Sequence, residues 1–335
     1  AKVKVYPIYL EVSPVGACNH RCTFCAVDYI GYIPRSLNTL RLKDTIAQMG
    51  KLGVRSIMFA GEGEPLLHKN LPEIINNTKM NKIDVAITTN GTMMSENWVR
   101  SCLDSISWIK ISCNAGDAAS YKAVHRGKDG DWEKVWENLA FTVEHRNIEK
   151  LATAIGIQTV ILPENIETIE DLCMDAKLCG IDYIVLKPYS QHLSSIETAK
   201  KYGDMKYQDI SELKNIRDKF SDSTFQVILR ENAIEDANKE THSYDKCYAT
   251  PTFWAYIMST GDVYTCSAYL LDERFKIGNI NEQTFQEIWE GKKRAENMKL
   301  MENLDISGCR KNCRMNQVNK YLDDIRNPSE HSSFI

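Results

Sequence analysis

Three cysteines lie within eight residues of one another near the start of the sequence: Cys18, Cys22 and Cys25. A cubane iron–sulfur cluster has four irons and is usually held by four thiolates. A local set of three thiolates leaves one iron without a protein ligand, and an open coordination position is typical of a metal that does chemistry. The spacing C-x3-C-x2-C therefore predicts a catalytic iron–sulfur site.

A structural zinc site is the alternative, with His20 as the fourth ligand beside the three cysteines. Zinc knuckles and ribbons usually combine two C-x2-C pairs, or one such pair with an H-x3-5-H pair, and this loop fits neither pattern well. The aromatic Phe24 beside the last cysteine also suits a cluster that must be shielded from water. The iron–sulfur interpretation is therefore favoured.

A second set of four cysteines lies in the last third of the chain: Cys247, Cys266, Cys309 and Cys313. Four thiolates complete the coordination of a cubane cluster, although they also suit a structural zinc ion. Of the other four cysteines, Cys102, Cys173 and Cys179 lie in helical stretches and are expected in the core. Cys113 ends a predicted strand near the first site, where a hydrogen-atom-donor role is one hypothesis.

The elements that must position these residues alternate between short β-branched runs and amphipathic helical stretches. Six strands are predicted, with helices between them; the strands are 7–14, 54–60, 84–88, 108–112, 152–162 and 183–187. Such alternation indicates an α/β fold with a parallel sheet and right-handed crossovers. Six units are too few for the eight-fold barrel, so we expect a partial, TIM-like (β/α)6 barrel.

After about residue 189 the pattern changes to a polar helical stretch, then short strands and a predicted hairpin over 253–269. We place a boundary near residue 222, which divides the chain into the barrel (1–222), a small α+β cluster-binding domain (223–326) and a tail (327–335).

In parallel sheets and barrels, chemistry occurs at the carboxyl ends of the strands. Several polar or glycine-containing segments fall there independently: the cysteine loop, Gly61–Pro65, Asn90, Ser112 and Lys187. This coincidence supports the barrel assignment and predicts one site formed by all of them.

The overall composition is that of an ordinary globular protein, with 43% hydrophobic and 26% charged residues and a net charge of −4. No apolar run is long enough to span a bilayer, and there is no secretory signal or basic excess. We therefore expect a cytoplasmic protein with neither a membrane nor a nucleic acid as partner. In that compartment thiols stay reduced, which favours metal binding over disulfides.

The cysteine loop after an N-terminal strand resembles the radical S-adenosylmethionine (SAM) superfamily. The resemblance implies that Cys18, Cys22 and Cys25 hold a 4Fe–4S cluster and that SAM chelates its open iron. It further implies SAM contacts from Gly61, Gly63, Glu64 and Pro65, where Glu62 replaces a second glycine that the family often has. Asn90, Ser112 and Arg126 match polar contacts to the nucleoside and the SAM carboxylate.

The second cysteine set resembles the SPASM/twitch extension of that superfamily, because C-x13-G-x4-C at Cys247–Cys266 fits its signature. Four cysteines match the shorter twitch form with one auxiliary 4Fe–4S cluster on Cys247, Cys266, Cys309 and Cys313. The last pair is C-x3-C here, whereas the family often has C-x2-C. The resemblance thus implies two clusters and SAM as cofactors.

The activity implied is that of a radical enzyme. Reductive cleavage of SAM, with an electron from a partner such as flavodoxin or ferredoxin, yields a 5′-deoxyadenosyl radical that abstracts a hydrogen atom from the substrate.

Only a short segment precedes Cys18, so we expect no peptide-recognition domain ahead of the barrel. That favours a small polar substrate, such as a sugar, aminocyclitol or nucleotide-linked sugar, which is oxidised by dehydrogenation or epimerised. A peptide-modifying maturase is the alternative.

Within that chemistry, an oxidation would use the auxiliary cluster as electron acceptor and a side chain as proton acceptor. The candidate catalytic residues are Cys113, Glu11, Lys187 and Tyr189, and Gln158 and His192 are further polar groups at strand ends.

Overall fold

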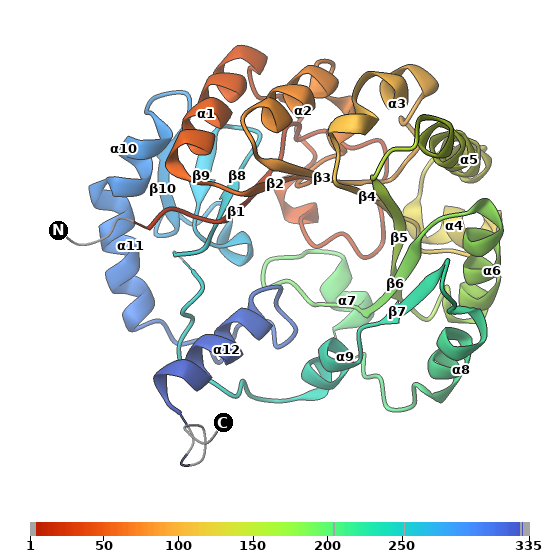
Figure 1. Cartoon of the computed structure of the whole chain (residues 1–335). Helices are drawn as coiled ribbons and strands as arrows, with labels where there is room; N and C mark the ends of the chain where they lie inside the picture. Colours follow the sequence, from red (N-terminus) through yellow and green to blue (C-terminus); the bar gives the residue numbers. More distant parts are fainter. Residues whose placement is uncertain (1–4, 204, 251, 329, 331–335) are drawn as a thin grey trace.

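The protein is built on one continuous sheet, as the computed structural model shows for residues 5–203, 205–250, 252–328 and 330 (Figure 1). Its ten strands lie in the order β10-β9-β8-β1-β2-β3-β4-β5-β6-β7. The strands are β1 (Tyr9–Val12), β2 (Ser56–Phe59), β3 (Asp84–Thr89), β4 (Trp108–Ser112), β5 (Ala154–Ile161), β6 (Tyr183–Pro188), β7 (Gln226–Leu229), β8 (Trp254–Ile257), β9 (Asp262–Tyr264) and β10 (Lys276–Asn279).

Strands β1 to β7 pair in parallel, each with its neighbour in sequence, and curve into a partial barrel. The helices between the strands cover its convex side, except for the short helix α7, which lies within the ring (Figure 1). They are α1 (Thr39–Leu52), α2 (Leu71–Met80), α3 (Glu96–Cys102), α4 (Ala118–His125), α5 (Asp131–Glu149), α6 (Ile169–Cys179), α7 (Thr198–Tyr202) and α8 (Ser211–Phe220). The predicted α/β partial barrel is confirmed.

The C-terminal part does not stand apart from this sheet. Strand β8 pairs in parallel with β1, with Tyr9 opposite Trp254, and β8, β9 and β10 then form the antiparallel extension. The predicted hairpin turns at Gly261, which has a φ of +88°. The remaining helices are α9 (Glu231–Asn238), α10 (Phe285–Glu290), α11 (Lys292–Glu302) and α12 (Asn316–Arg326), and α12 lies across the open side of the barrel (Figure 1).

The division into two domains at residue 222 stays a prediction. Strand β7 begins just after that point and pairs with β6, so the barrel sheet continues across the boundary. Most of the predicted tail, at 329 and 331–335, lies outside the described residues.

Alternation along each strand defines two faces. On β4, Ile109 and Ile111 are fully buried in the main core against the helices, whereas Trp108, Lys110 and Ser112 face the concave side. The same alternation places Glu11 on β1 and Lys187 on β6 on the concave face. The carboxyl ends of the strands therefore open onto a space lined by polar and charged side chains.

No helix in the described part of the chain has the length and apolar character needed to cross a membrane.

Candidate functional site

The cysteine loop follows β1 and packs against the glycine-rich segment that follows β2. The backbone N–H of Glu64 donates to the Ala17 carbonyl at 2.9 Å. A side chain at Gly63 would place its Cβ 2.2 Å from the Ala17 oxygen, and one at Gly61, whose φ is +124°, would meet Ser13 at 2.3 Å. These glycines are thus required for close contact with the loop that carries the cysteines.

Glu64 joins the ends of two neighbouring strands. Its buried carboxylate accepts hydrogen bonds from the Leu66 N–H (3.0 Å), the Thr89 hydroxyl (2.5 Å) and the Asn90 N–H (2.8 Å). Burial raises the pKa of this carboxyl group, while the three hydrogen bonds favour its ionised form. Glu64 therefore fixes the loops after β2 and β3 relative to each other.

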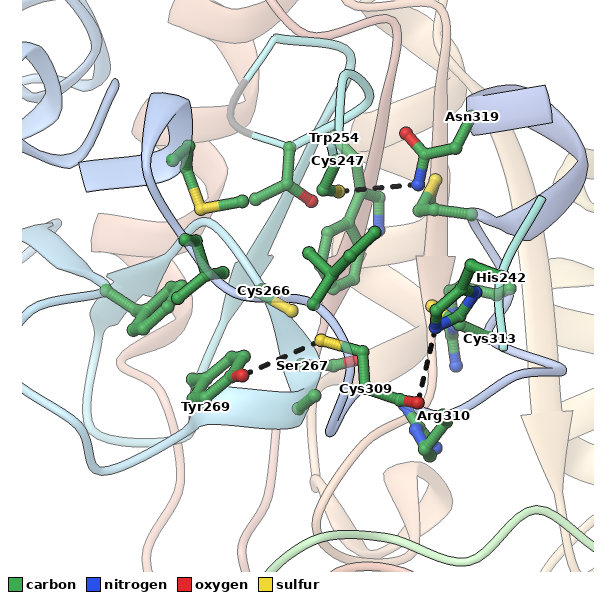
Figure 2. Close-up of a pocket in the computed structure, with 18 of the residues that line it drawn as sticks. His242, Cys247, Trp254, Cys266, Ser267, Tyr269, Cys309, Arg310, Cys313 and Asn319 are labelled. Carbon is green, nitrogen blue, oxygen red and sulfur yellow. Dashed lines mark hydrogen bonds between the residues drawn. The ribbon is translucent and has the colours of Figure 1, made fainter. Parts of the chain in front are cut away.

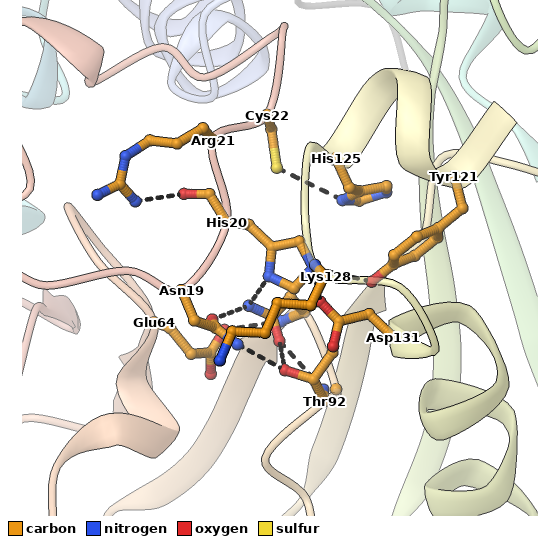
Figure 3. A network of polar contacts seen from close by, with 12 residues as sticks. Asn19, His20, Arg21, Cys22, Glu64, Thr92, Tyr121, His125, Lys128 and Asp131 are labelled. Atoms are coloured by element: carbon orange, nitrogen blue, oxygen red, sulfur yellow. Dashed lines mark hydrogen bonds and ion pairs between the residues drawn. The ribbon is translucent and has the colours of Figure 1, made fainter. Parts of the chain in front are cut away.

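Asn90 connects Glu64 to the cysteine loop through Asn19 and His20, which Figure 3 shows close to Thr92. Its side-chain amide donates to Asn19 Oδ1 at 2.7 Å and to His20 Nδ1 at 2.9 Å, and its oxygen accepts from the N–H and hydroxyl of Thr92. Because His20 Nδ1 accepts, its Nε2 carries the proton and faces Tyr121 (3.3 Å) and Asp131 (3.4 Å). His20 is therefore engaged with these groups and does not join the cysteines.

His125, at the end of α4, contacts one of the three cysteines directly. The Asn114 N–H donates to His125 Nε2 at 2.9 Å, so the proton is on Nδ1, which lies 3.4 Å from Cys22 Sγ. The ring is fully buried, and burial lowers its pKa to about 3, so it is a neutral hydrogen-bond donor to the sulfur. Sequence reasoning missed this residue because its spacing to the cysteines carries no signal.

Cys18, Cys22 and Cys25 lie together at the mouth of the barrel, and burial raises the pKa of all three thiols, that of Cys18 to about 11. Among the described residues, no set of three or more His, Cys, Asp or Glu side chains is placed to hold a single metal ion. A zinc ion needs all its thiolate ligands at about 2.3 Å from one point, whereas a cubane cluster binds each thiolate on a different iron. The three thiols therefore suit three irons of a cubane cluster, as the C-x3-C-x2-C spacing predicts.

The second cysteine set lines one pocket, with about 590 Å³ of space between atoms when its open mouth is included (Figure 2). Cys247 comes from the segment before β8, Cys266 follows β9, and Cys309 and Cys313 lie on the loop before α12. The Asn319 amide donates to Cys247 Sγ at 3.4 Å, and the Tyr269 hydroxyl lies 3.6 Å from Cys309 Sγ. This mostly apolar pocket with four converging sulfurs suits a complete cluster.

Two contacts connect this pocket to the barrel. Arg314, next to Cys313, forms an ion pair with the predicted catalytic residue Glu11 on β1. Glu62, which replaces the family's glycine, accepts from the Ser259 N–H in the β8–β9 turn at 2.6 Å and pairs with Arg35 at 3.0 Å. Glu62 thus attaches the β8–β9 hairpin to the barrel, which a glycine at this position could not do.

The structure places the other predicted residues as follows. Ser112 ends β4 on the concave face, and Tyr189 is buried after β6, where its hydroxyl donates to Gln191 at 2.7 Å. Cys113 points to the opposite face, fully buried in the main core, and its thiol donates to the Ala115 carbonyl at 3.7 Å. The Arg126 side chain is 51% exposed and lies 3.9 Å from Glu197. The structure thus does not bring Cys113 or Arg126 into the concave space.

Comparison with known families agrees with this geometry. The model of the Radical SAM superfamily matches residues 12–176, and that of an iron–sulfur cluster-binding domain, SPASM, matches residues 247–314. Among curated proteins, the chain is 29% identical to the GTP 3′,8-cyclase of Clostridium botulinum (strain Okra / Type B1) over 214 residues. That match covers 59% of this chain and 64% of the relative.

Among solved structures, Streptococcus suis SuiB bound to S-adenosylmethionine superposes with a TM-score of 0.66 at 19% identity, covering 86% of this chain and 66% of that one. Native anSMEcpe with bound AdoMet and Kp18Cys peptide gives a TM-score of 0.64 at 20% identity, covering 89% and 84%. These likenesses establish the shared fold. Together the two matched domains imply 4Fe–4S clusters and SAM as cofactors. The chain belongs to the radical SAM superfamily and carries a C-terminal SPASM-type cluster-binding domain.

Proposed function

We propose that this enzyme removes a hydrogen atom from a small polar substrate and oxidises it, with the auxiliary cluster as electron acceptor. The observation that carries this proposal is the link between Arg314 and Glu11, which brings the loop of Cys309 and Cys313 to the concave face. Four thiolates leave no open iron in the auxiliary cluster, which suits electron transfer better than substrate binding.

In this proposal Cys18, Cys22 and Cys25 hold the first cluster, whose open iron binds SAM and supplies the electron that cleaves it. The segment Gly61–Pro65 positions the loop and contacts SAM with Asn90 and Ser112. Asn90 uses its side-chain amide for Asn19, His20 and Thr92 and its backbone N–H for Glu64, so a hydrogen bond from either group to SAM would have to replace one of these. Arg126 would have to leave Glu197 to reach the SAM carboxylate.

Three residues are our proposals for binding the substrate or taking its proton: Glu11, Lys187 and Tyr189. They come from β1 and from β6 with the loop that follows it, on opposite sides of the concave space. A flavodoxin or ferredoxin in the cytoplasm is the proposed source of the electron.

The test is a screen of the reconstituted protein with SAM and dithionite under anaerobic conditions. Nucleotide-linked sugars, aminocyclitols and simple sugars are offered in one set and peptides in another, and release of 5′-deoxyadenosine is measured. We expect a compound of the first set to raise the release above the substrate-free rate. Turnover supported by peptides alone would contradict the proposal.

Peptide modification is the second candidate, because the same fold occurs in SuiB bound to the precursor peptide SuiA and in anSMEcpe bound to a Kp18Cys peptide. At 18% and 20% identity this likeness supports the fold alone, whereas the 28–34% identical curated relatives with the name GTP 3′,8-cyclase act on a nucleotide. The small substrate therefore stays the first candidate.

A prediction on the first cluster follows from the hydrogen bond between His125 Nδ1 and Cys22 Sγ. The variant His125→Phe removes this donor, and hydrogen bonds to the sulfurs help to set cluster potentials because they stabilise the more negative reduced state. We expect a more negative midpoint potential for this cluster in a redox titration followed by EPR. The control His145→Phe changes a histidine that stacks on Phe141 in α5, far along the chain from the cysteines, and should leave the potential unchanged. Equal potentials in His125→Phe and the wild type would contradict this role.

A further inference from the structure

Four cationic side chains meet on the concave side of the barrel. They come from β4, from β6, from the residue after β7 and from the loop between the last two cysteines, and we call them the cation cluster: Lys110, Lys187, Arg230 and Arg310. Three strands and a distant loop thus supply one charge each to the same region.

The strand register places three of them on the same face. Leu186 and Leu229 pair across β6 and β7 and point into the core, so Lys187 and Arg230, the next residues, both point to the concave side. Lys110 lies on the same face of β4, with its ammonium group 4.6 Å from the ring centre of Trp108. Lys110 and Lys187 are partly buried, and Arg230 is exposed at the rim.

The cation cluster has no ion-pair partner within the described residues. No ion pair joins any of its four side chains to a carboxylate in that part of the chain, and Glu11, on the same face, is paired with Arg314. The charges that act on Lys187 are those of Lys110, Arg310 and Arg230, and together with burial they lower its pKa to about 8. Buried charges are normally paired, so this arrangement is unfavourable unless something else supplies negative charge.

Two buried donors without a partner lie beside the cluster. Within the described residues, Arg310 Nε and the Tyr29 hydroxyl are buried and make no hydrogen bond. Both lie next to the pocket of the second cysteine set, because Arg310 lines that pocket and Cys266 is among the groups that act on Tyr29. The charge of Arg310 also acts on Lys187. Leaving such a donor unsatisfied is unfavourable, so both are expected to find an acceptor once a ligand or the auxiliary cluster is bound.

We propose that the cation cluster binds an anionic oxygen group of the substrate, either a phosphoryl group or a carboxylate. The proposal rests on the proposed function for the identity of the site as the substrate site. It gives Lys187 the role of an anion ligand. The competing explanation is that these cations offset the negative charge of the auxiliary cluster, because Arg310 lies between two of its proposed ligands.

Binding is measured by anaerobic calorimetry on the reconstituted holoenzyme with SAM present, so that the SAM site is filled. Pyrophosphate probes the phosphoryl form, succinate the carboxylate form, and myo-inositol is the neutral comparison. We expect one of the two anions to bind and myo-inositol not to. In Lys187→Met and in Arg230→Gln the affinity for that anion should fall about tenfold or more, because a hydrogen bond to a charged group contributes about 1.5–3 kcal/mol. The control Lys292→Met removes a 90% exposed lysine of α11 and should bind like the wild type.

Thermal unfolding gives a second readout that needs no ligand. Without the bound anion, Lys187→Met should raise the melting temperature, because it removes a partly buried charge that only other cations surround. A lowered melting temperature would indicate a structural partner and contradict the proposal.

Absence of binding of both anions by the wild type, or unchanged affinity in both variants, would overturn the proposal. The proposal would also be overturned by a variant that shifts the midpoint potential of the auxiliary cluster but leaves the affinity for the anion unchanged. That result would identify the cations as counter-charges of the cluster. Substrate-free cleavage of SAM by the control Lys292→Met, followed as 5′-deoxyadenosine, should equal that of the wild type. Failure of SAM cleavage in the wild type would count against the proposed function and leave the binding result standing.

Discussion

Replacing Cys18, Cys22 and Cys25 together by alanine should lower the iron content from about eight to about four per chain, as expected for the loss of one of two cubane clusters. Cleavage of SAM should fall below detection, because the remaining four-thiolate cluster has no open iron for SAM. Iron and acid-labile sulfide are counted after anaerobic reconstitution, and 5′-deoxyadenosine is measured after addition of dithionite.

The matched control is Cys179→Ala, at the end of α6, which should keep all its iron and full SAM cleavage. A complementary variant with alanine at Cys247 and Cys266 should also lose about four irons but retain substrate-free cleavage of SAM. Zinc in place of the second four irons would show that the C-terminal site is structural and would remove its role as electron acceptor.

The variant Gly63→Ala should unfold more easily than the wild type by about 3 kcal/mol or more and should not load the first cluster. The added Cβ would lie 2.2 Å from the Ala17 oxygen and 2.7 Å from the Val15 oxygen. Both are backbone atoms of the segment that leads to Cys18, so relief of the clash must displace the cysteine loop. Denaturant unfolding and the absorbance of the reconstituted cluster measure the two effects.

The same substitution at Gly308 is the control, because nothing lies within 4 Å of a Cβ at that position, next to Cys309. Gly308→Ala should leave both stability and iron content unchanged. Normal cluster loading by Gly63→Ala would mean that the loop adjusts without loss and that this glycine serves the ligand only.

Regular elements with strong periodicity were predictable from the sequence. Strand β4 has the bounds that the sequence indicated, because it combines a clear apolar period with turn signals at its ends. Helices α10 and α11 are separate because Gly291 has an extended conformation with ψ of 166° and interrupts the hydrogen-bond ladder.

The residues of the candidate site were predictable where they belong to motifs formed by neighbouring positions in the sequence. Cysteine spacing and strand ends indicated both cysteine sites and the segment Gly61–Pro65. The partners of these residues come from distant parts of the chain: His125 for Cys22, Ser259 for Glu62, and Arg314 for Glu11. Such pairs depend on tertiary packing, which one sequence without its fold does not reveal.

The pairing of β8 with β1 has a consequence for the order in which the parts of the protein fold. Residues 9–12 and 254–257 are far apart in sequence, and contacts of this kind form late because a long loop must close first. During synthesis β1 can pair with β2 early, so the cysteine loop can reach its place against Gly63 before the hairpin exists. The C-terminal sulfurs converge only after β8 has docked. We therefore expect the two metal centres to mature in sequence, the N-terminal one first.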